Sequence, residues 1–184
     1  MIGEGKNLVE TLKEEGGTDW GVPNPFLHET RGPGTSKMKL VYGSLLEQDE
    51  KGNVSWLAES WSFEGNDYTF TLFDNLTFHD NKPLTTEDVA FTIDYFKENP
   101  PLNNSLGVGD KFIVDYYTIV DEKTITITVK EANADTFTTS GSFVIIPKHI
   151  WEKVEVLEHH THFLTMDVDI SFIICNICTF EEDA

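Results

Sequence analysis

Apolar and polar side chains alternate along Tyr68–Leu72, at the start of a patterned stretch that runs to Pro101. β-Branched and aromatic residues in such an alternation favour a strand with one buried face. Asp74-Asn75 interrupts the alternation, and Thr77-Phe78-His79 is expected to form a second short strand. Asp80-Asn81 then breaks the pattern again, so the sequence predicts a strand, a turn, a short strand and another turn.

A helix is predicted to follow these turns. Thr85 lies three residues before Asp88, which is the spacing of a capping box at a helix start. Pro100 and Pro101 cannot continue a helix, so the predicted helix ends before them. One face of it carries the apolar residues Val89, Ile93 and Phe96.

The flanking segments predict an antiparallel sheet. Phe112–Val120 and Thr124–Lys130 are expected to be two strands, the second with clean alternation, so that one sheet face is buried and the other is wet. Glu64–Asp67 is expected to be a hairpin-type turn into the strand that begins at Tyr68. The apolar segment Met38–Leu46 is expected to be helical, and residues 131–142 a small polar connection.

A family resemblance rests on residues 70–97, FTLFDNLTFHDNKPLTTEDVAFTIDYFK. This segment resembles the F-x-L strand, the F-H-D-G turn and the P-L-T-A-E-D-V helix start of solute-binding protein family 5. These are the extracytoplasmic solute-binding proteins of peptide/nickel-type ABC transporters. Asn81 replaces the usual glycine and Thr86 the usual alanine; asparagine tolerates the left-handed backbone almost as well as glycine does.

Two further segments extend the resemblance. Leu57–Trp61, LAESW, resembles a family motif in which a short helical turn buries its leucine and tryptophan, and both side chains are expected in the core. Phe143–Lys153, FVIIPKHIWEK, resembles the family's strand and following helix, which Pro147 would open. His79-Asp80 and His149 are interpreted as turn and helix-start residues rather than acid/base groups.

The resemblance implies an α+β fold: a partial type II periplasmic-binding-protein-like fold. Residues 1–153 are expected to form the N-terminal lobe portion, with an inserted antiparallel subdomain over about residues 41–134. The second lobe is expected to be absent. Residues 154–184 do not resemble the family and are expected to be a divergent C-terminal tail, whose apolar run Ile170–Ile177 would pair as one more strand.

Composition narrows the function classes. The formal net charge is −19, with 13 Lys and Arg against 32 Asp and Glu, which argues against binding to nucleic acid or to anionic membranes. No nucleotide-binding or nucleophile-elbow motif occurs, so neither an enzymatic activity nor a cofactor is expected. The N-terminus carries no signal-peptide pattern, whereas family members are exported. The resemblance implies an extracytoplasmic location, and a native start would imply a cytoplasmic one.

Two candidate sites are considered. Residues 17–34 form a Gly/Pro-rich loop, and the resemblance places this region beside the ligand cleft, so its expected ligand-binding residues are Trp20, Phe26, His28 and Arg31. The alternative is that these aromatic side chains pack at the edge of the core. The second candidate is a weak metal site, because H-x-H is a poor half-site for a tetrahedral ion. Its members would be His160, His162, Cys175 and Cys178.

The resemblance implies a substrate-binding component of an ABC transporter, with an oligopeptide-like solute held between two lobes and an ABC permease as partner. The competing interpretation is a truncated or diverged paralogue with no transport role. Such a paralogue would act as an interaction module, with a homodimer formed through the surface left by the missing lobe.

Overall fold

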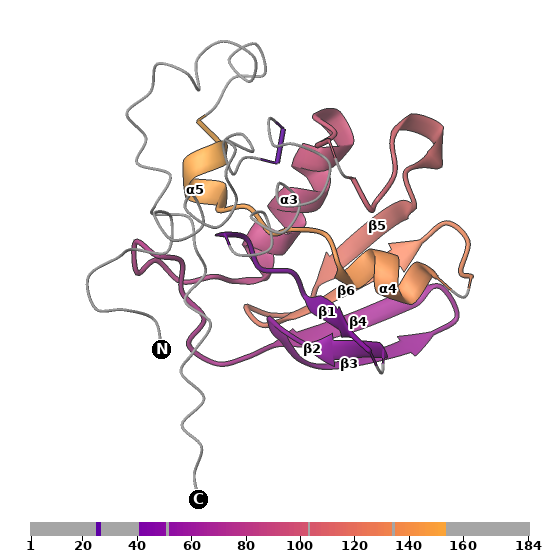
Figure 1. Cartoon of the computed structure of the whole chain (residues 1–184), viewed down its shortest axis with the longest axis horizontal. Helices are drawn as coiled ribbons and strands as arrows, with labels where there is room; N and C mark the ends of the chain where they lie inside the picture. Colours follow the sequence, from indigo (N-terminus) through magenta and orange to yellow (C-terminus); the bar gives the residue numbers. More distant parts are fainter. Residues whose placement is uncertain (1–24, 27–40, 51, 103, 134, 154–184) are drawn as a thin grey trace, which may run out of the picture.

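The computed structural model describes residues 25–26, 41–50, 52–102, 104–133 and 135–153 (Figure 1). Within these residues a four-stranded antiparallel sheet has the strand order β3-β4-β6-β5, beside a separate two-stranded hairpin, β1-β2. The strands are β1 (Leu46–Asp49), β2 (Gly52–Ser55), β3 (Ala58–Glu64), β4 (Asp67–Leu72), β5 (Val114–Ile119) and β6 (Thr124–Val129). The helices are α3 (Thr86–Glu98), the 3-10 turn η1 (Gly109–Lys111), α4 (Thr136–Gly141) and α5 (Lys148–Trp151).

The central hairpin confirms the alternation seen in the sequence. β3 and β4 pair antiparallel from Trp61 opposite Phe70 to Glu64 opposite Asp67. Gly65 turns the chain between them with a φ of 60°. This is the left-handed region, which glycine adopts without the steric cost that a side chain would add. The predicted hairpin turn and the strand that starts near Tyr68 are therefore both correct.

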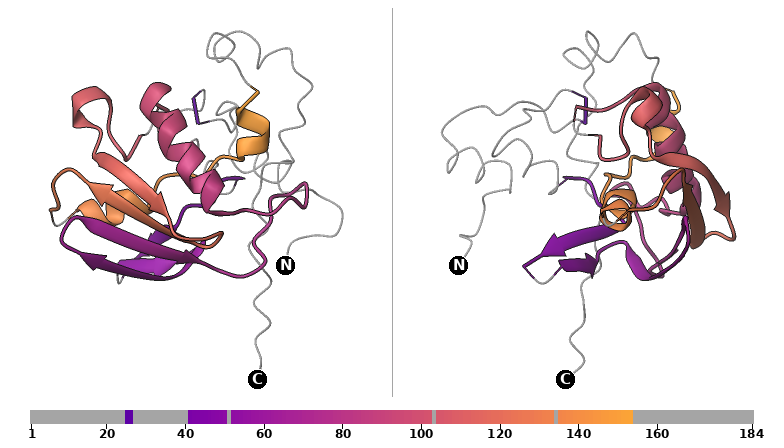
Figure 2. Two further views of the ribbon diagram at one scale, coloured as in Figure 1. Left: turned by 180° about the vertical axis from the view of Figure 1, so that it is seen from behind. Right: turned by 90° about the vertical axis from the view of Figure 1, so that its right-hand side faces the viewer.

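The sheet has one apolar face and one hydroxyl-rich face. Ile125, Ile127 and Val129 of β6 are almost fully buried. On the opposite face, Thr69 and Thr126 share a hydrogen bond of 2.9 Å between their hydroxyl groups. Helices α3 and α4 cover the apolar face only (Figure 2), so the predicted one-sided burial and the α+β class are confirmed.

Helix α3 begins and ends where its sequence predicts. The Thr85 hydroxyl accepts a hydrogen bond from Glu87 N, and the Asp88 carboxylate accepts one from Thr85 N at 3.0 Å, which completes a capping box. Val89, Ile93 and Phe96 are buried against the sheet. Asn99 is the C-cap residue, directly before the two prolines.

The predicted helical turn at Leu57–Trp61 is wrong, and the helix predicted over Met38–Leu46 does not continue to its end: Val41 is helical, but the chain is extended from Ser44 onward. Within Met38–Leu46, Ser44 forms an antiparallel bridge with Val144, and β1 starts at Leu46. Leu57–Trp61 contains the start of β3 rather than a helical turn. The cause is tertiary pairing: the N–H groups of Leu57 and Ala58 donate to the carbonyls of Ser44 and Leu45, which a helix would have used internally. Leu57 is fully buried as expected, whereas Trp61 is only half-buried.

Residues 131–142 hold a helix that the sequence did not reveal. Helix α4 places Phe137 against the apolar face of the β3–β4 hairpin, with ring centroids 5.8 Å from Trp61 and 6.2 Å from Phe70. A helix with a single large apolar side chain carries no detectable periodicity, so only the packed sheet identifies it.

The turns after β4 use two asparagines in the left-handed region. Asn75 has a φ of 60° and Asn81 a φ of 63°, which confirms that Asn81 can replace the family's glycine. The expected second short strand at Thr77–His79 is reduced to one bridge, between Thr77 and Pro83. A single bridge forms because the turn at Asp80-Asn81 returns the chain at once.

The segment after α4 runs beside Gly43 and Ser44. Ile145 N donates to Gly43 O at 2.8 Å, and Val144 makes the single bridge to Ser44, so the expected strand is one bridge long. Pro147 lies at the N-cap of α5, one residue before the position predicted for it. Among the described residues, none of the helices has the length and apolarity to cross a bilayer.

Candidate functional site

One carboxylate joins the N-terminal ends of α3 and α5. Asp88 accepts a hydrogen bond from Thr85 N through Oδ2, and its other oxygen, Oδ1, accepts one from Lys148 N at 3.0 Å. Lys148 also extends its ammonium group to Glu87 Oε2 at 2.8 Å. The Asp88 side chain therefore has two roles: it completes the capping box of α3, and it binds the backbone of Lys148, 60 residues further along the chain.

A second polar link lies beside the first. His149 Nε2 is 2.8 Å from Asp80 Oδ2, and both side chains are largely shielded from solvent. The histidine ring also makes an edge contact with Phe78, with centroids 5.6 Å apart. Asp80 Oδ1 accepts a hydrogen bond from Lys82 N, which confirms its interpretation as a turn residue. The turn after β4 is thus attached to α5.

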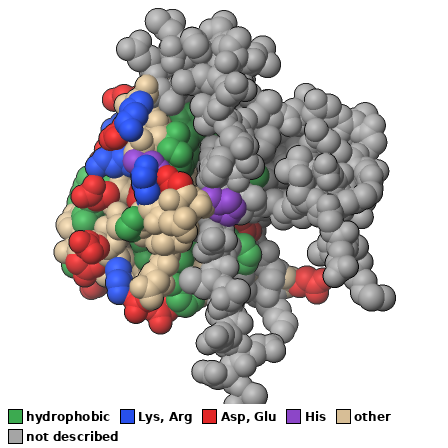
Figure 3. Space-filling model, turned by 90° about the vertical axis from the view of Figure 1, so that its left-hand side faces the viewer, with side chains coloured by type: hydrophobic (Ala, Val, Ile, Leu, Met, Phe, Trp, Pro, Cys, Tyr) green, Lys and Arg blue, Asp and Glu red, His purple; other side chains and the backbone are tan. Residues whose placement is uncertain are grey.

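These links border a groove of about 640 Å³ on the surface. The β5–β6 turn forms its other wall. The groove is lined by Lys82, Pro83, Thr85, Thr86, Glu87, Asp88, Ile119, Asp121, Glu122, Lys148, His149 and Glu152. Acidic, basic and histidine side chains mix on the left-hand face of the molecule (Figure 3). Five acidic residues against two lysines leave the groove negative.

The surroundings shift the pKa values of the two aspartates in opposite directions. Burial raises the pKa of Asp88, because desolvation outweighs the hydrogen bonds from the N–H groups of Thr85 and Lys148. Burial acts in the same sense on Asp80, but the Lys82 N–H and His149 together lower its pKa. Both carboxylates accept hydrogen bonds from backbone N–H groups. For Asp88 this requires burying a charged group, which costs solvation free energy.

The polar groups of the groove are already committed to one another. Thr86 Oγ1 donates to Asp121 O at 2.6 Å, and Thr86 N donates to Glu122 O at 3.1 Å, so α3 is attached to the β5–β6 turn. No cluster of three or more His, Cys, Asp or Glu side chains within the described ranges is placed to hold a metal ion. This arrangement joins α3, α5, the β5–β6 turn and the Asp80-Asn81 turn to one another.

Phe26 is the one predicted ligand-binding residue inside the described part of the chain. Its ring lies 6.0 Å from Tyr95, 6.0 Å from Phe96 and 5.3 Å from Trp151, measured between centroids. The side chain therefore belongs to an aromatic cluster with residues of α3 and α5. Trp20, His28 and Arg31 lie outside the described residues, so their role stays a prediction.

The weak metal candidates lie in a part of the chain that the structure does not describe. His160, His162, Cys175 and Cys178 all follow residue 153, as does the predicted strand at Ile170–Ile177. The proposed boundary of the tail, at residue 154, therefore stays an expectation.

Sequence reasoning noticed both members of the Asp80–His149 pair but not their contact. Each residue belongs to a separate short motif, FHDN or PKHIW, and nothing local connects the two. The pairing arises because α5 packs beside the N-terminal end of α3. One sequence signal could have suggested the Asp80–His149 contact. Each of the two motifs places a titratable side chain next to a turn or a helix start, and the two side chains are complementary as carboxylate and imidazole.

The antiparallel sheet with helices on one face corresponds to part of the type II periplasmic-binding-protein-like fold of the solved relatives. Residues 53–167 match the bacterial extracellular solute-binding proteins, family 5 Middle. The chain belongs to this family, the solute-binding proteins of peptide/nickel-type ABC transporters.

Individual relatives agree with the family assignment. The chain is 29% identical, over 79% of its length, to the probable peptide-binding protein YejA of Agrobacterium fabrum. The ABC transporter substrate-binding protein CtaP of Listeria monocytogenes is 31% identical, with a TM-score of 0.61 over 76% of this chain and 29% of that one. NikZ of Campylobacter jejuni, solved with Ni(L-His), is 25% identical, with a TM-score of 0.60 over 76% of this chain and 28% of that one. The chain spans about a quarter of the length of the curated relative.

Proposed function

We propose that this chain is part of the substrate-binding component of a peptide/nickel-type ABC transporter, and that its solute is a peptide. The observation that carries the proposal is the similarity to a peptide-binding relative over 79% of this chain, on a sheet and helix scaffold of the same fold. The family is described as extracellular, which supports an extracytoplasmic location.

We place the solute beside the aromatic cluster around Phe26. Tyr95 and Trp151 contact Phe26, which lies between Trp20 and His28 in the 17–34 segment that also contains Arg31. Arg31 would bind the carboxylate terminus of a peptide, and Trp20 would cover an apolar side chain. The solute would be held between this lobe and the remainder of a receptor, which an ABC permease would recognise in its closed form.

The proposal is tested by thermal unfolding of the purified chain with di- to pentapeptides, nickel chloride and nickel–histidine. A ligand that binds only the folded state raises the midpoint of unfolding by mass action. A rise with one peptide class, reduced by Arg31→Ala but not by the exposed control Lys97→Ala, is expected. No rise with any peptide would favour the interaction-module interpretation, and a rise with nickel–histidine alone would change the solute.

A further inference from the structure

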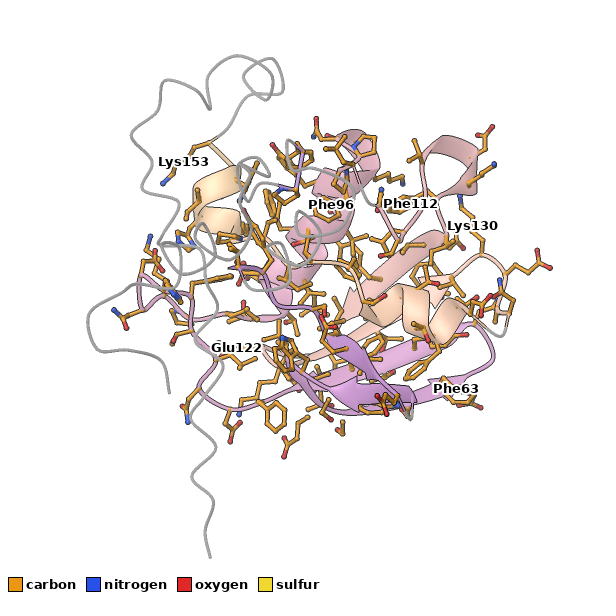
Figure 4. The ribbon with its side chains drawn as sticks, viewed as in Figure 1. Phe63, Phe96, Phe112, Glu122, Lys130 and Lys153 are labelled. Atoms are coloured by element: carbon orange, nitrogen blue, oxygen red, sulfur yellow. The ribbon has the colours of Figure 1, made fainter. Side chains whose placement is uncertain are left out.

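One side of α3 carries a row of three residues that meet the segment around α5. Asp88, Thr92 and Tyr95 follow one another at helical spacing, so they lie on one face of α3. Figure 4 shows α5, followed by the labelled Lys153, beside the helix that carries the labelled Phe96. We call Asp88, Thr92 and Tyr95 the docking row of α3.

Thr92 makes the central contact of the docking row and is fully buried. Its hydroxyl accepts a hydrogen bond from Ile146 N at 3.0 Å and donates one to Asp88 O at 2.7 Å. Ile146 is also fully buried, so water does not reach its N–H group. A buried peptide group without a partner is costly, and the Thr92 hydroxyl is the acceptor that removes this cost.

The other two members of the docking row hold the same segment further along the chain. Asp88 Oδ1 accepts a hydrogen bond from Lys148 N at 3.0 Å. Tyr95 makes an edge contact with Trp151, with ring centroids 5.9 Å apart. α5 is a single turn in which Trp151 N donates to Pro147 O, so these contacts act on one rigid piece of chain.

Trp151 is the side chain through which this docking reaches Phe26. It is almost fully buried, and its ring centroid is 5.3 Å from that of Phe26. Pro25, the preceding residue, is bound to the chain that follows α3, because Leu102 N donates to its carbonyl oxygen at 3.0 Å. A shift of α5 along α3 would therefore move Trp151 relative to Phe26.

We propose that Thr92 is a positioning residue for the solute site. Its hydroxyl keeps the segment of α5 on α3 in the one placement that brings Trp151 against Phe26. Hydrogen bonds are directional, whereas apolar contacts alone would tolerate other placements along the helix. The inference rests on the proposed function in one respect, namely that the solute lies beside Phe26.

Fluorine NMR tests the positioning without any solute. The chain has four tryptophans, and labelling with 5-fluorotryptophan gives each a signal, of which that of Trp151 is identified by its loss in Trp151→Phe. Because the Phe26 ring lies close to Trp151, Phe26→Ala is expected to displace this signal. Thr92→Val keeps the shape but removes the hydroxyl, and is expected to displace the signal in the same direction. Thr92→Ser retains the hydroxyl and is expected to leave the signal at its wild-type position.

Thr128→Val is the matched control. Thr128 is another buried threonine, and its hydroxyl donates to Asp67 Oδ1 at 2.6 Å on the wet face of the sheet. Its loss should lower the midpoint of thermal unfolding without moving the Trp151 signal. A Trp151 signal that Thr92→Val leaves in place, or that Thr128→Val displaces as far, overturns the proposal.

Amide hydrogen exchange of the wild-type chain adds a measurement that does not depend on a variant folding. The N–H groups of Ile146 and Lys148 are expected to exchange as slowly as those in the interior of α3, because both donate to buried side chains of that helix. Rapid exchange at Ile146 overturns the proposal, since Thr92 would then not hold this segment.

Solute affinity gives the functional readout, with Ala-Phe-Ala as the probe, because its aromatic side chain suits the cluster around Phe26. Thr92→Val is expected to raise the dissociation constant at least about fivefold in calorimetric titration, since only molecules with α5 in place bind at full affinity. Thr128→Val and Thr92→Ser should leave it unchanged. Unchanged affinity in Thr92→Val overturns the role of Thr92 in the solute site. A wild-type chain that does not bind Ala-Phe-Ala contradicts the proposed solute site instead, and the fluorine signals then decide whether Thr92 positions Trp151.

Discussion

His149 and Asp80 lie 69 residues apart in the chain, yet Nε2 and Oδ2 of their side chains are 2.8 Å from each other. The contact ties the turn after β4 to α5, at the point where α5 meets the N-terminal end of α3. Lys148, the preceding residue, is held by Asp88. Two neighbouring residues of one short helix therefore join it to two different parts of the fold.

A double-mutant cycle with Asp80→Asn and His149→Gln measures this link. Asparagine retains the oxygen that accepts the Lys82 N–H, so the turn is preserved. A coupling free energy of about 0.5 to 1 kcal/mol is expected. The His149 side chain is 21% exposed and that of Asp80 is 27% exposed, so water weakens their interaction. Urea unfolding of the four proteins gives the value, and a coupling near zero would show that the contact adds no stability.

Asp88→Ala should be the most damaging change in the groove. It removes the acceptor of Thr85 N and that of Lys148 N together, at a site that is almost fully buried. The free energy of unfolding is expected to fall by about 2 to 3 kcal/mol. Glu98→Ala, at an exposed position on the same helix, should change it by less than about 0.5 kcal/mol. Equal losses in the two variants would refute the double role of Asp88.

His79 should make the fold sensitive to mild acid. Burial lowers its pKa below the ordinary value of 6.5, and its buried Nδ1 has no hydrogen-bond partner among the residues that the structure describes. The unfolded chain therefore binds the proton more tightly, so stability falls as the pH drops through 6.5 toward the lower pKa of the folded state. Urea unfolding from about pH 8 to about pH 5 should show this loss.

The control for that measurement is His79→Gln, which cannot take up a proton. The variant should lose less stability than the wild type over the same pH range, because other groups titrate equally in both proteins. Parallel stability curves for the two proteins would assign the pH dependence to groups other than His79.

Phe137→Ala tests the helix that sequence patterns missed. The Phe137 ring lies within about 6 Å of the rings of Trp61, Phe63, Tyr68 and Phe70, measured between centroids. Removing it should lower the free energy of unfolding by about 2 to 4 kcal/mol. Phe63→Ala, the same change at a side chain that is 68% exposed, should lower it by less than about 1 kcal/mol. A reversed order would place the important contacts elsewhere.

Local chemistry determined the central part of this protein. The alternation through β4, the turns at Asn75 and Asn81 and the capping box of Thr85 and Asp88 each depend on a few adjacent residues. Short-range sterics and hydrogen bonds fix such features, so they could be predicted from the sequence, and the family resemblance rested on the same residues.

Tertiary structure decided the remainder, because the competing conformations differ little in local energy. Ser44–Leu46 and the start of β3 are extended because their peptide groups pair with each other across the chain. α4 exists because Phe137 has an apolar sheet to cover, and Asp80 finds His149 because α5 folds back onto α3. Within the described residues, β5 lies at an edge of the sheet because of the strand order, which no alternation of side chains within β5 specifies.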